Sequence, residues 1–304
     1  ELVYCGYMIQ APEKDWDDIK GLDLHDKILL CEINEPGNRP GGNFDGEDMT
    51  YYGRVTYKCE KAAELGAAGV LIIHNDKGAA YDWEVLRNGW TKERFFLPDR
   101  VNPLPFEGWV SEPLAEAVFK AARLDRQALL ARAETVEFAP VATGLRAVIR
   151  QRPTFRTVEA KNVAGIVRAR NKHANGRMII VSAHYDHLGK NDAVEGDDKI
   201  YNGAVDNCSA TASMLVLASY YAQKPELLRD DVCFVGVTAE EEGLLGSDYF
   251  ARHLPFPAEK VLADINFEMT NVWGETEDVF AIGGAYSGLD QVCRDAAEGL
   301  GLEY

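Results

Sequence analysis

The feature that most constrains this sequence is an apolar run, residues 232–237, followed closely by three consecutive glutamates. The run is rich in β-branched and aromatic residues and is bounded by acidic ones, which predicts a strand buried on both faces. Glu240, Glu241 and Glu242 stand just past its C-terminal end, and a helix-like segment follows them. Because open α/β sheets bind ligands at the carboxyl ends of their strands, we expect an active site here.

Composition and charge limit the classes of function. The 304 residues are 46% hydrophobic and 27% charged, which is ordinary for a globular protein, and the length suggests about two domains. No apolar run approaches the roughly 20 residues that a membrane-spanning helix needs. The formal net charge of −17 repels phosphate backbones, so nucleic acid is excluded as a partner, whereas cations remain compatible.

The first part of the chain predicts a small module of strands and helices. Residues 34–50 are rich in Gly, Pro, Asn and Asp and predict an exposed loop. The order of elements and the segment GAAGVLIIHN resemble the protease-associated domain, a small β-rich module of several peptidases that carries no catalytic residue. The elements expected are strands at 2–10, 27–33 and 69–73, a helix at 57–65 that Gly66 caps, and short helices at 112–123 and 125–133.

The second part of the chain alternates strands and helices, which predicts a sheet sandwiched between helices. Pro140, Gly144 and Pro153 interrupt strand-like pieces between the two parts, and we place the domains at 1–145 and 146–304. The second domain is expected to have strands at 161–168, 177–183, 231–238, 261–267 and 278–282, and helices at about 207–222, 243–253 and 286–298.

Three of these strands end in side chains that can bind metals. Since the carboxyl ends of neighbouring strands converge, one histidine and several acids should meet in a single crevice. So many carboxylates need cations to neutralise them, and a mixture of imidazole and carboxylate suits zinc better than calcium or magnesium. The side chains concerned are His184, Glu240, Glu241 and Glu268 after the strands, and Asp206 where a helix begins.

The sequence neighbours of these residues indicate separate roles. Asp186 is close enough to accept the second ring N–H of His184, and Asp206 is the natural bridge of a two-metal site. Adjacent residues diverge on leaving a strand, so one of Glu240 and Glu241 can bind metal while the other acts as a general base. This division of labour describes a hydrolase.

Four stretches of the second part also carry a family resemblance. They resemble the co-catalytic di-zinc aminopeptidases, a family that also holds the glutamate carboxypeptidases (metallopeptidase clan MH). The resemblance implies that His184 binds the first zinc, Asp206 bridges both ions and Glu241 binds the second. It makes Glu240 the general base and Asp186 the residue that orients His184. The stretches are SAHYDHLG at 182–189, NGAVDNCSA at 202–210, TAEEEGLLGS at 238–247 and INFEMTN at 265–271.

The family pattern also implies a cis peptide bond at Asp206–Asn207. The sequence departs from the family's set of zinc ligands in two places. Glu268 stands where the third ligand of the first zinc is usually an aspartate. The family's last ligand is a histidine nearer the C-terminus, and no histidine follows His253. We therefore expect a fragment truncated at both ends, inactive as it stands, or an incomplete second zinc site. His187 is interpreted as a loop residue or a neighbour of a ligand, not as a ligand.

The sequence as a whole predicts a zinc-dependent aminopeptidase that acts on peptides with a free N-terminus and holds two zinc ions when intact. Two alternatives stay open: an acyltransferase that resembles glutaminyl cyclase and uses one zinc, and a receptor-like binding protein with a decayed metal site. Export to the periplasm or the extracellular space is implied by the family resemblance, although no signal peptide is present in this sequence.

Overall fold

Two separate sheets organise the chain, one in each of two units, Glu1–Phe155 and Arg156–Tyr304. The computed structural model describes residues 1–37, 42, 44, 46, 48–99, 104–192 and 196–304. The predicted domains, 1–145 and 146–304, stay a prediction, as does the assignment of the first to a protease-associated domain.

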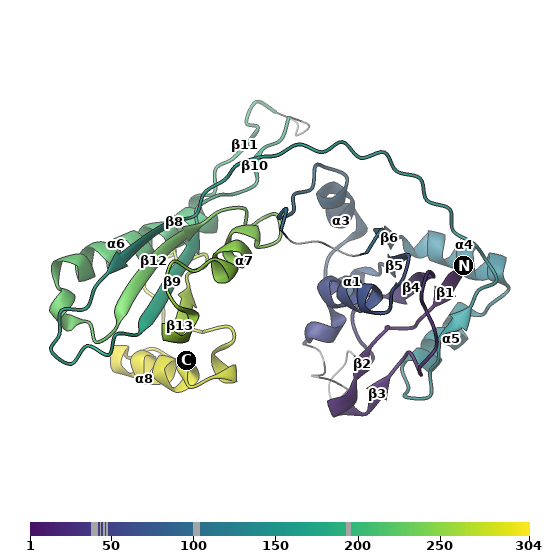
Figure 1. Cartoon of the computed structure of the whole chain (residues 1–304), viewed down its shortest axis with the longest axis horizontal. Helices are drawn as coiled ribbons and strands as arrows, with labels where there is room; N and C mark the ends of the chain where they lie inside the picture. The colour runs from purple at the N-terminus through teal and green to yellow at the C-terminus, as the bar shows by residue number, and fades with distance from the viewer. Residues whose placement is uncertain (38–41, 43, 45, 47, 100–103, 193–195) are drawn as a thin grey trace. The chain divides into compact units, whose positions relative to one another are not determined.

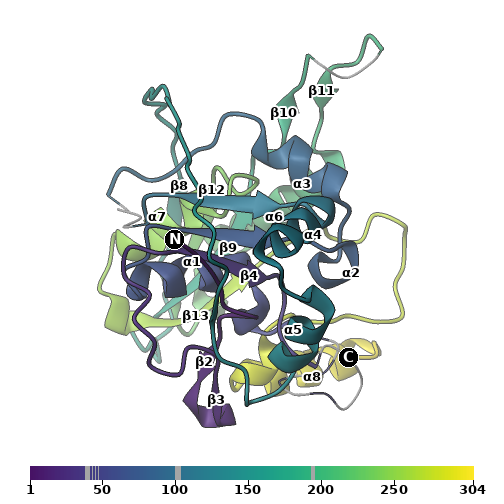
Figure 2. The same ribbon diagram turned by 90° about the vertical axis from the view of Figure 1, so that its right-hand side faces the viewer.

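The main sheet of the first unit has the strand order β6-β5-β4-β1-β7, in which β7 alone runs antiparallel to its neighbour. Helix α1 packs on one face, and α4 and α5 pack on the other, where Figure 2 shows them in front of the strands. The strands are β1 (Leu2–Tyr4), β2 (Gln10–Ala11), β3 (Trp16–Asp17), β4 (Ile28–Glu32), β5 (Gly69–Ile73), β6 (Glu107–Val110) and β7 (Val141–Ala142). The α-helices are α1 (Val55–Glu64), α2 (Asp76–Ala79), α3 (Trp83–Trp90), α4 (Glu112–Ala122) and α5 (Arg126–Ala133).

The first unit departs from its prediction in three places. The strand expected at 2–10 ends at Tyr4 because the chain turns at Gly6 and Met8, which both have positive φ. The loop expected to be exposed begins buried, since the Glu35 carboxylate accepts hydrogen bonds from the N–H and hydroxyl of Thr50. Its residues 38–41, 43, 45 and 47 lie outside the described residues. Helices hold more of the described residues than strands do, although a β-rich module was expected.

The second unit is a mixed sheet between helices, as predicted (Figure 1). The strand order is β13-β9-β12-β8; β13, β9 and β12 are parallel, and β8 is antiparallel to β12. Helix α6 packs on one face, and residues of α7 and the loop after it pack on the other. The elements are β8 (Val163–Val167), β9 (Met178–His184), β10 (Gly189–Lys190), β11 (Ile200–Tyr201), β12 (Asp231–Val237), β13 (Val261–Asn266), α6 (Ala210–Gln223), α7 (Leu245–Arg252) and α8 (Leu289–Leu300).

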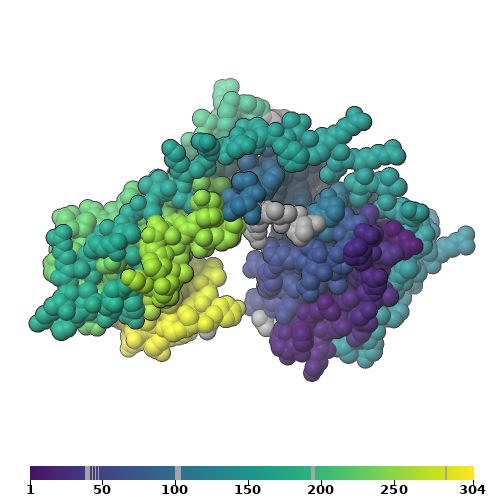
Figure 3. Space-filling model, in the orientation of Figure 1, coloured from purple at the N-terminus to yellow at the C-terminus, as the bar shows by residue number. Residues whose placement is uncertain are grey.

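Residues 232–237 are all buried, which confirms a strand covered on both faces, whereas the strand expected at 278–282 is wrong. Asp278 makes only an isolated bridge with Glu303, and the side chains of Phe280 and Ile282 are 80% and 94% exposed. The C-terminal residues, yellow in Figure 3, lie on the surface of this unit. A short apolar run forms a strand only where a neighbouring strand can pair with its backbone.

The turn between β12 and α7 is held by close backbone packing. Asn162 accepts a hydrogen bond from the N–H of Thr238 (3.1 Å) and donates one to the carbonyl oxygen of Gly246 (2.7 Å). A β-carbon added at Gly246 would lie 2.1 Å from the carbonyl oxygen of Thr238. Any larger residue must therefore push this turn away from the strand.

We expect Gly246→Ala to lower the free energy of unfolding of the second unit by about 1–3 kcal/mol, because the added methyl group overlaps backbone atoms. Urea unfolding of the variant and the parent protein measures the change. Gly299→Ala is the matched control, since a β-carbon at this α8 position meets no atom within 4 Å, and it should be neutral or stabilising by up to about 1 kcal/mol. Equal midpoints for Gly246→Ala and the parent would contradict the packing described here.

Candidate metal centre

The parallel strands bring their C-terminal ends to one edge of the second sheet. His184, the last residue of β9, is level with Val237, the last residue of β12, and Asn266 at the end of β13 is level with Ser182. The residues that follow β12 and β13 therefore emerge beside His184. The hydroxyl of Thr211 in α6 donates a hydrogen bond to the carbonyl oxygen of His184 (2.8 Å), which ties the helix to this edge.

Asp206 reaches the same edge from the turn that precedes α6. The peptide bond between Asp206 and Asn207 is cis, as the family resemblance implies. The Asn207 amide donates a hydrogen bond to the carbonyl oxygen of Phe267 (3.1 Å) and accepts one from the N–H of Met269 (3.0 Å). These two bonds flank Glu268 and hold it next to Asp206.

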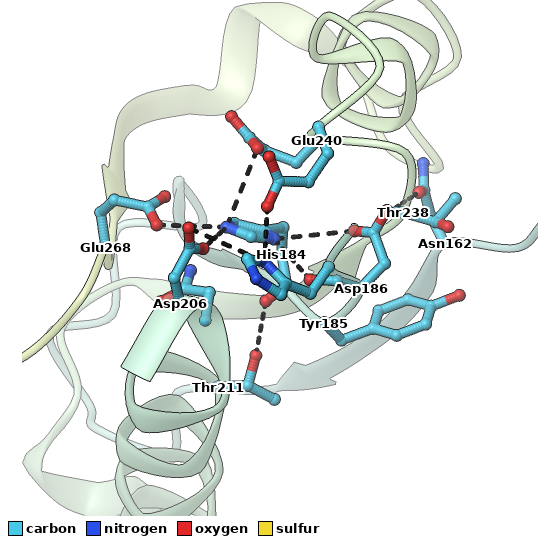
Figure 4. A network of polar contacts seen from close by, with 12 residues as sticks. Asn162, His184, Tyr185, Asp186, Asp206, Thr211, Thr238, Glu240 and Glu268 are labelled. Atoms are coloured by element: carbon cyan, nitrogen blue, oxygen red, sulfur yellow. Dashed lines mark hydrogen bonds and ion pairs between the residues drawn. The ribbon is translucent and has the colours of Figure 1, made fainter. Parts of the chain in front are cut away.

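A first cluster consists of His184, Asp206 and Glu268, whose side chains point toward one another (Figure 4). Nε2 of His184 lies 3.0 Å from Oδ1 of Asp206 and 3.1 Å from Oε1 of Glu268. Nδ1 lies 3.0 Å from the carbonyl oxygen of Asp186, which only accepts hydrogen bonds, so Nδ1 carries a proton. Nε2 faces two carboxylate oxygens, so it donates a second proton to them or shares a cation with them.

This arrangement of acceptors requires a positive charge in its middle. The His184 side chain is only 2% exposed, and Oδ1 of Asp206 is buried without a hydrogen-bond partner. Buried acceptors that face one another are unfavourable unless a proton or a cation lies between them. Zinc binds imidazole nitrogen and carboxylate oxygen at about 2.0–2.2 Å, so the three converging atoms fit this ion.

Burial and neighbouring carboxylates raise the pKa of Glu240, and neighbouring carboxylates raise that of His184. Burial acts to lower the pKa of His184, but the negative charge and hydrogen bond of Glu268 and the charge of Glu240 outweigh it. The pKa of Glu240 is also raised, first by burial and then by the charges of Glu241, Glu268 and Asp206, against the effect of His184. Both groups therefore hold their protons to a higher pH than usual, and a bound cation would compete with these protons.

The two adjacent glutamates diverge, as expected of neighbours that leave a strand. Oε2 of Glu240 lies 3.9 Å from Nε2 of His184, on the side of the first cluster. Oε1 of Glu241 lies 2.6 Å from Nδ1 of His187, which forms a second cluster with Asp206 and Glu241. His187 thus lies beside Glu241, in keeping with its interpretation as a loop residue or a neighbour of a ligand.

The hydrogen bond predicted between His184 and the carboxylate of Asp186 is replaced by a bond to the backbone. Oδ1 of Asp186 is 3.6 Å from Nδ1 of His184 and has no hydrogen-bond partner among the described residues. The chain turns back after β9, which brings the carbonyl oxygen of Asp186 closer to the ring than the carboxylate. The structure therefore orients the ring through the main chain.

Comparison with known proteins relates the second part of the chain to a peptidase family. Residues 162–304 match the family model of peptidase family M28. The chain is 29% identical, over 157 residues, to aminopeptidase YwaD of Bacillus subtilis (strain 168); the match spans 49% of this chain and 31% of that protein. These matches agree with the resemblance to an aminopeptidase family over residues 162–304.

Two solved structures show a low similarity to this chain. An aminopeptidase from Aneurinibacillus sp. strain AM-1 has a TM-score of 0.41 and 22% identity, with 88% of this chain and 50% of that chain covered. BSAP, a zinc aminopeptidase from Bacillus subtilis, has a TM-score of 0.39 and 20% identity, with 99% of this chain and 57% of that chain covered. The chain thus spans little more than half the length of these proteins.

In the metal-free protein, we expect His184 to titrate above the ordinary imidazole pKa and Glu268→Gln to lower that pKa, because the variant removes one of the two negative charges beside Nε2. Two-dimensional ¹H–¹⁵N NMR of the imidazole nitrogens against pH, in the presence of a chelator, measures both values. Glu226→Gln is the control, since Glu226 precedes β12 at the end of the strand opposite Glu240. An unchanged His184 pKa in Glu268→Gln would show that the two side chains do not interact in solution.

Proposed function

Since residues 162–304 match the family model of peptidase family M28, we propose that this protein is a zinc-dependent aminopeptidase that hydrolyses the N-terminal bond of peptides. The observation that carries the proposal is the convergence of His184, Asp206 and Glu268 on one point, with Glu240 alongside. One histidine and two carboxylates form a donor set found at catalytic zinc ions, where a further position stays open for water or substrate.

We assign the metal-binding side chains by their positions around Asp206. His184 and Glu268 would hold one zinc ion, Glu241 would hold a second, and Asp206 would bridge the two. When bound, the ions supply Lewis-acid chemistry: they activate a water molecule and polarise the carbonyl oxygen of the scissile bond. Glu268 is longer than the aspartate usual in the family, and its Oε1 nevertheless comes within 3.1 Å of Nε2 of His184.

Glu240 is the general base of this proposal. Its raised pKa, caused first by burial and then by neighbouring carboxylates, brings it closer to neutral pH, where proton transfer in both directions is efficient. Glu240 takes a proton from the attacking water as the carbon–oxygen bond forms. It then gives a proton to the leaving amine as the carbon–nitrogen bond breaks, so the carboxylate is regenerated at the end of each turnover.

The acidic character of the protein supports a substrate with a free α-amino group. The formal net charge is −17, and part of it is concentrated at one sheet edge, where Glu240, Glu241 and Glu268 lie. A field of this sign draws the ammonium group of a peptide N-terminus toward the crevice.

Among the described residues, no helix is both long enough and apolar enough to cross a bilayer. Export is part of the same proposal and rests on the family resemblance.

The alternative of an acyltransferase that resembles glutaminyl cyclase differs in its metal content. That reading requires one zinc ion per chain. The second cluster, formed by His187, Asp206 and Glu241, favours two ions and therefore the peptidase. A receptor-like protein with a decayed site is disfavoured by the same two clusters.

We expect Glu240→Gln to retain its metal and to lose about 100- to 10,000-fold in kcat, because the amide cannot accept the proton of the attacking water. Aminoacyl p-nitroanilide hydrolysis measures turnover, and mass spectrometry of the metal content measures zinc. Glu242→Gln neutralises the next glutamate of the same run, and we expect it to retain both zinc and turnover. Turnover in Glu240→Gln equal to that of the parent would remove the base assignment.

A further inference from the structure

A cavity lies at the carboxyl edge of the main sheet in the first unit. Glu32, Ile73 and Val110 end the parallel strands β4, β5 and β6 at the same level. His74 directly follows β5, and Ser111 follows β6 and precedes α4. Ligands of open α/β sheets bind at such an edge. The cavity has a volume of about 350 Å³, at the lower end of the range for small-ligand sites, and is lined by His74, Asn75, Asp76, Trp83, Ser111, Glu112 and Pro113.

His74 contributes a buried polar atom without a partner to this lining. Its side chain is 2% exposed, and Nε2 makes no hydrogen bond to any described residue. Oδ1 of Asp76 lies 3.5 Å from Nδ1, and its negative charge favours the tautomer that carries the proton on Nδ1. Nε2 is then a buried acceptor with a free lone pair. A donor from a ligand would relieve this unfavourable state.

Aromatic rings surround His74. The ring centroids of Trp83, Tyr81 and Trp109 lie 5.5, 5.6 and 5.8 Å from that of His74. Trp109 packs against the core, and its indole N–H, which also lacks a partner among the described residues, is not part of the cavity lining. Tyr81 is 36% exposed, so a shift of its ring opens a way to His74 without disturbing the core. The faces of Trp83 and Tyr81 attract cations.

The charges around the cavity also favour a cation. The carboxylates of Asp76 and Glu112 are 65% and 60% exposed, and among the described residues neither lysine nor arginine lines the cavity. Arg126 lies 3.8 Å from Glu112, but it also contacts Glu116 at 2.8 Å and Glu32 at 3.4 Å. One guanidinium shared by three carboxylates leaves the region negative. An anion at the start of α4 would meet this negative field and is therefore disfavoured.

From these observations we propose that the cavity binds a guanidinium group, either of an arginine side chain in a peptide or of a small free compound. A planar guanidinium stacks on Trp83 while its N–H groups donate to Nε2 of His74 and to a carboxylate oxygen of Asp76 or Glu112. A primary ammonium group is more strongly hydrated and has no flat face to stack. The site uses no residue of the metal centre, so it does not depend on the proposed peptidase activity.

The test follows ligand binding to the whole chain by ¹H–¹⁵N NMR in the presence of a chelator, at the indole N–H of Trp83 and the backbone amides of Asp76 and Ser111. The probes are Nα-acetyl-arginine methylamide and its citrulline and lysine counterparts, which all lack the free α-amino group of an aminopeptidase substrate. We expect the arginine probe to bind at least about tenfold more tightly than the citrulline probe, whose ureido group is uncharged. It should also bind more tightly than the lysine probe.

Two further ligands distinguish the source of the guanidinium group. Tighter binding of a capped Gly-Gly-Arg-Gly-Gly peptide than of methylguanidinium would identify an arginine within a peptide. The reverse order would identify a small free compound.

Variants of the rim locate the binding. Glu112→Gln and Trp83→Leu should each weaken the arginine probe about two- to fivefold, because each removes one exposed contact with the cation. Glu116→Gln is the matched control and should bind as the parent does, since Glu116 is 61% exposed on the same helix and contacts the same Arg126 but does not line the cavity. Equal binding of the arginine and citrulline probes, tighter binding of the lysine probe, or equal affinities of Glu112→Gln and Glu116→Gln would overturn the proposal.

Discussion

The site depends on the mutual repulsion of acceptors that the fold forces together. Nε2 of His184 faces oxygens of Asp206 and Glu268, and Oε2 of the Glu240 carboxylate lies 3.9 Å from the same nitrogen. Such a group of acceptors is stable only when a proton or a cation occupies its centre. The raised pKa values of His184 and Glu240 are the response of the metal-free protein to this constraint. A divalent ion would relieve the same repulsion, and it would supply the Lewis-acid chemistry that a hydrolase needs.

The rest of the second unit serves to hold these acceptors against their repulsion. Parallel pairing of β9 with β12 and β13 brings three strand ends to one edge. The side chain of Asn207 ties the turn of Asp206 to the backbone on both sides of Glu268, and Asn162 ties the turn after β12 to the backbone of Gly246. These amide side chains bear no charge, so they anchor the acidic residues without neutralising them. The anchoring leaves the acidic centre available for a cation.

Much of this architecture could be predicted from residue patterns. The strand at 69–73 was predicted to the residue, and the burial of 232–237 followed from its continuous apolar character. The association of His184, Asp206 and Glu268 followed from the rule that parallel strands share a carboxyl edge. The strand expected at 278–282 failed because a pattern of apolar residues cannot reveal whether a pairing partner exists. The bond from His184 to the carbonyl of Asp186, and the turn that brings His187 to Glu241, depend on backbone directions in loops that no side-chain pattern encodes.

The central claim is that Asp206 lies between two divalent cations. Anomalous diffraction at the zinc edge, from crystals of the protein loaded with zinc, tests it most directly. The account predicts two peaks about 3.5–4 Å apart, one beside His184 and Glu268 and the other beside Glu241, both next to Asp206. A zinc-loaded crystal with a single anomalous peak, or none, at this edge of the sheet would contradict it.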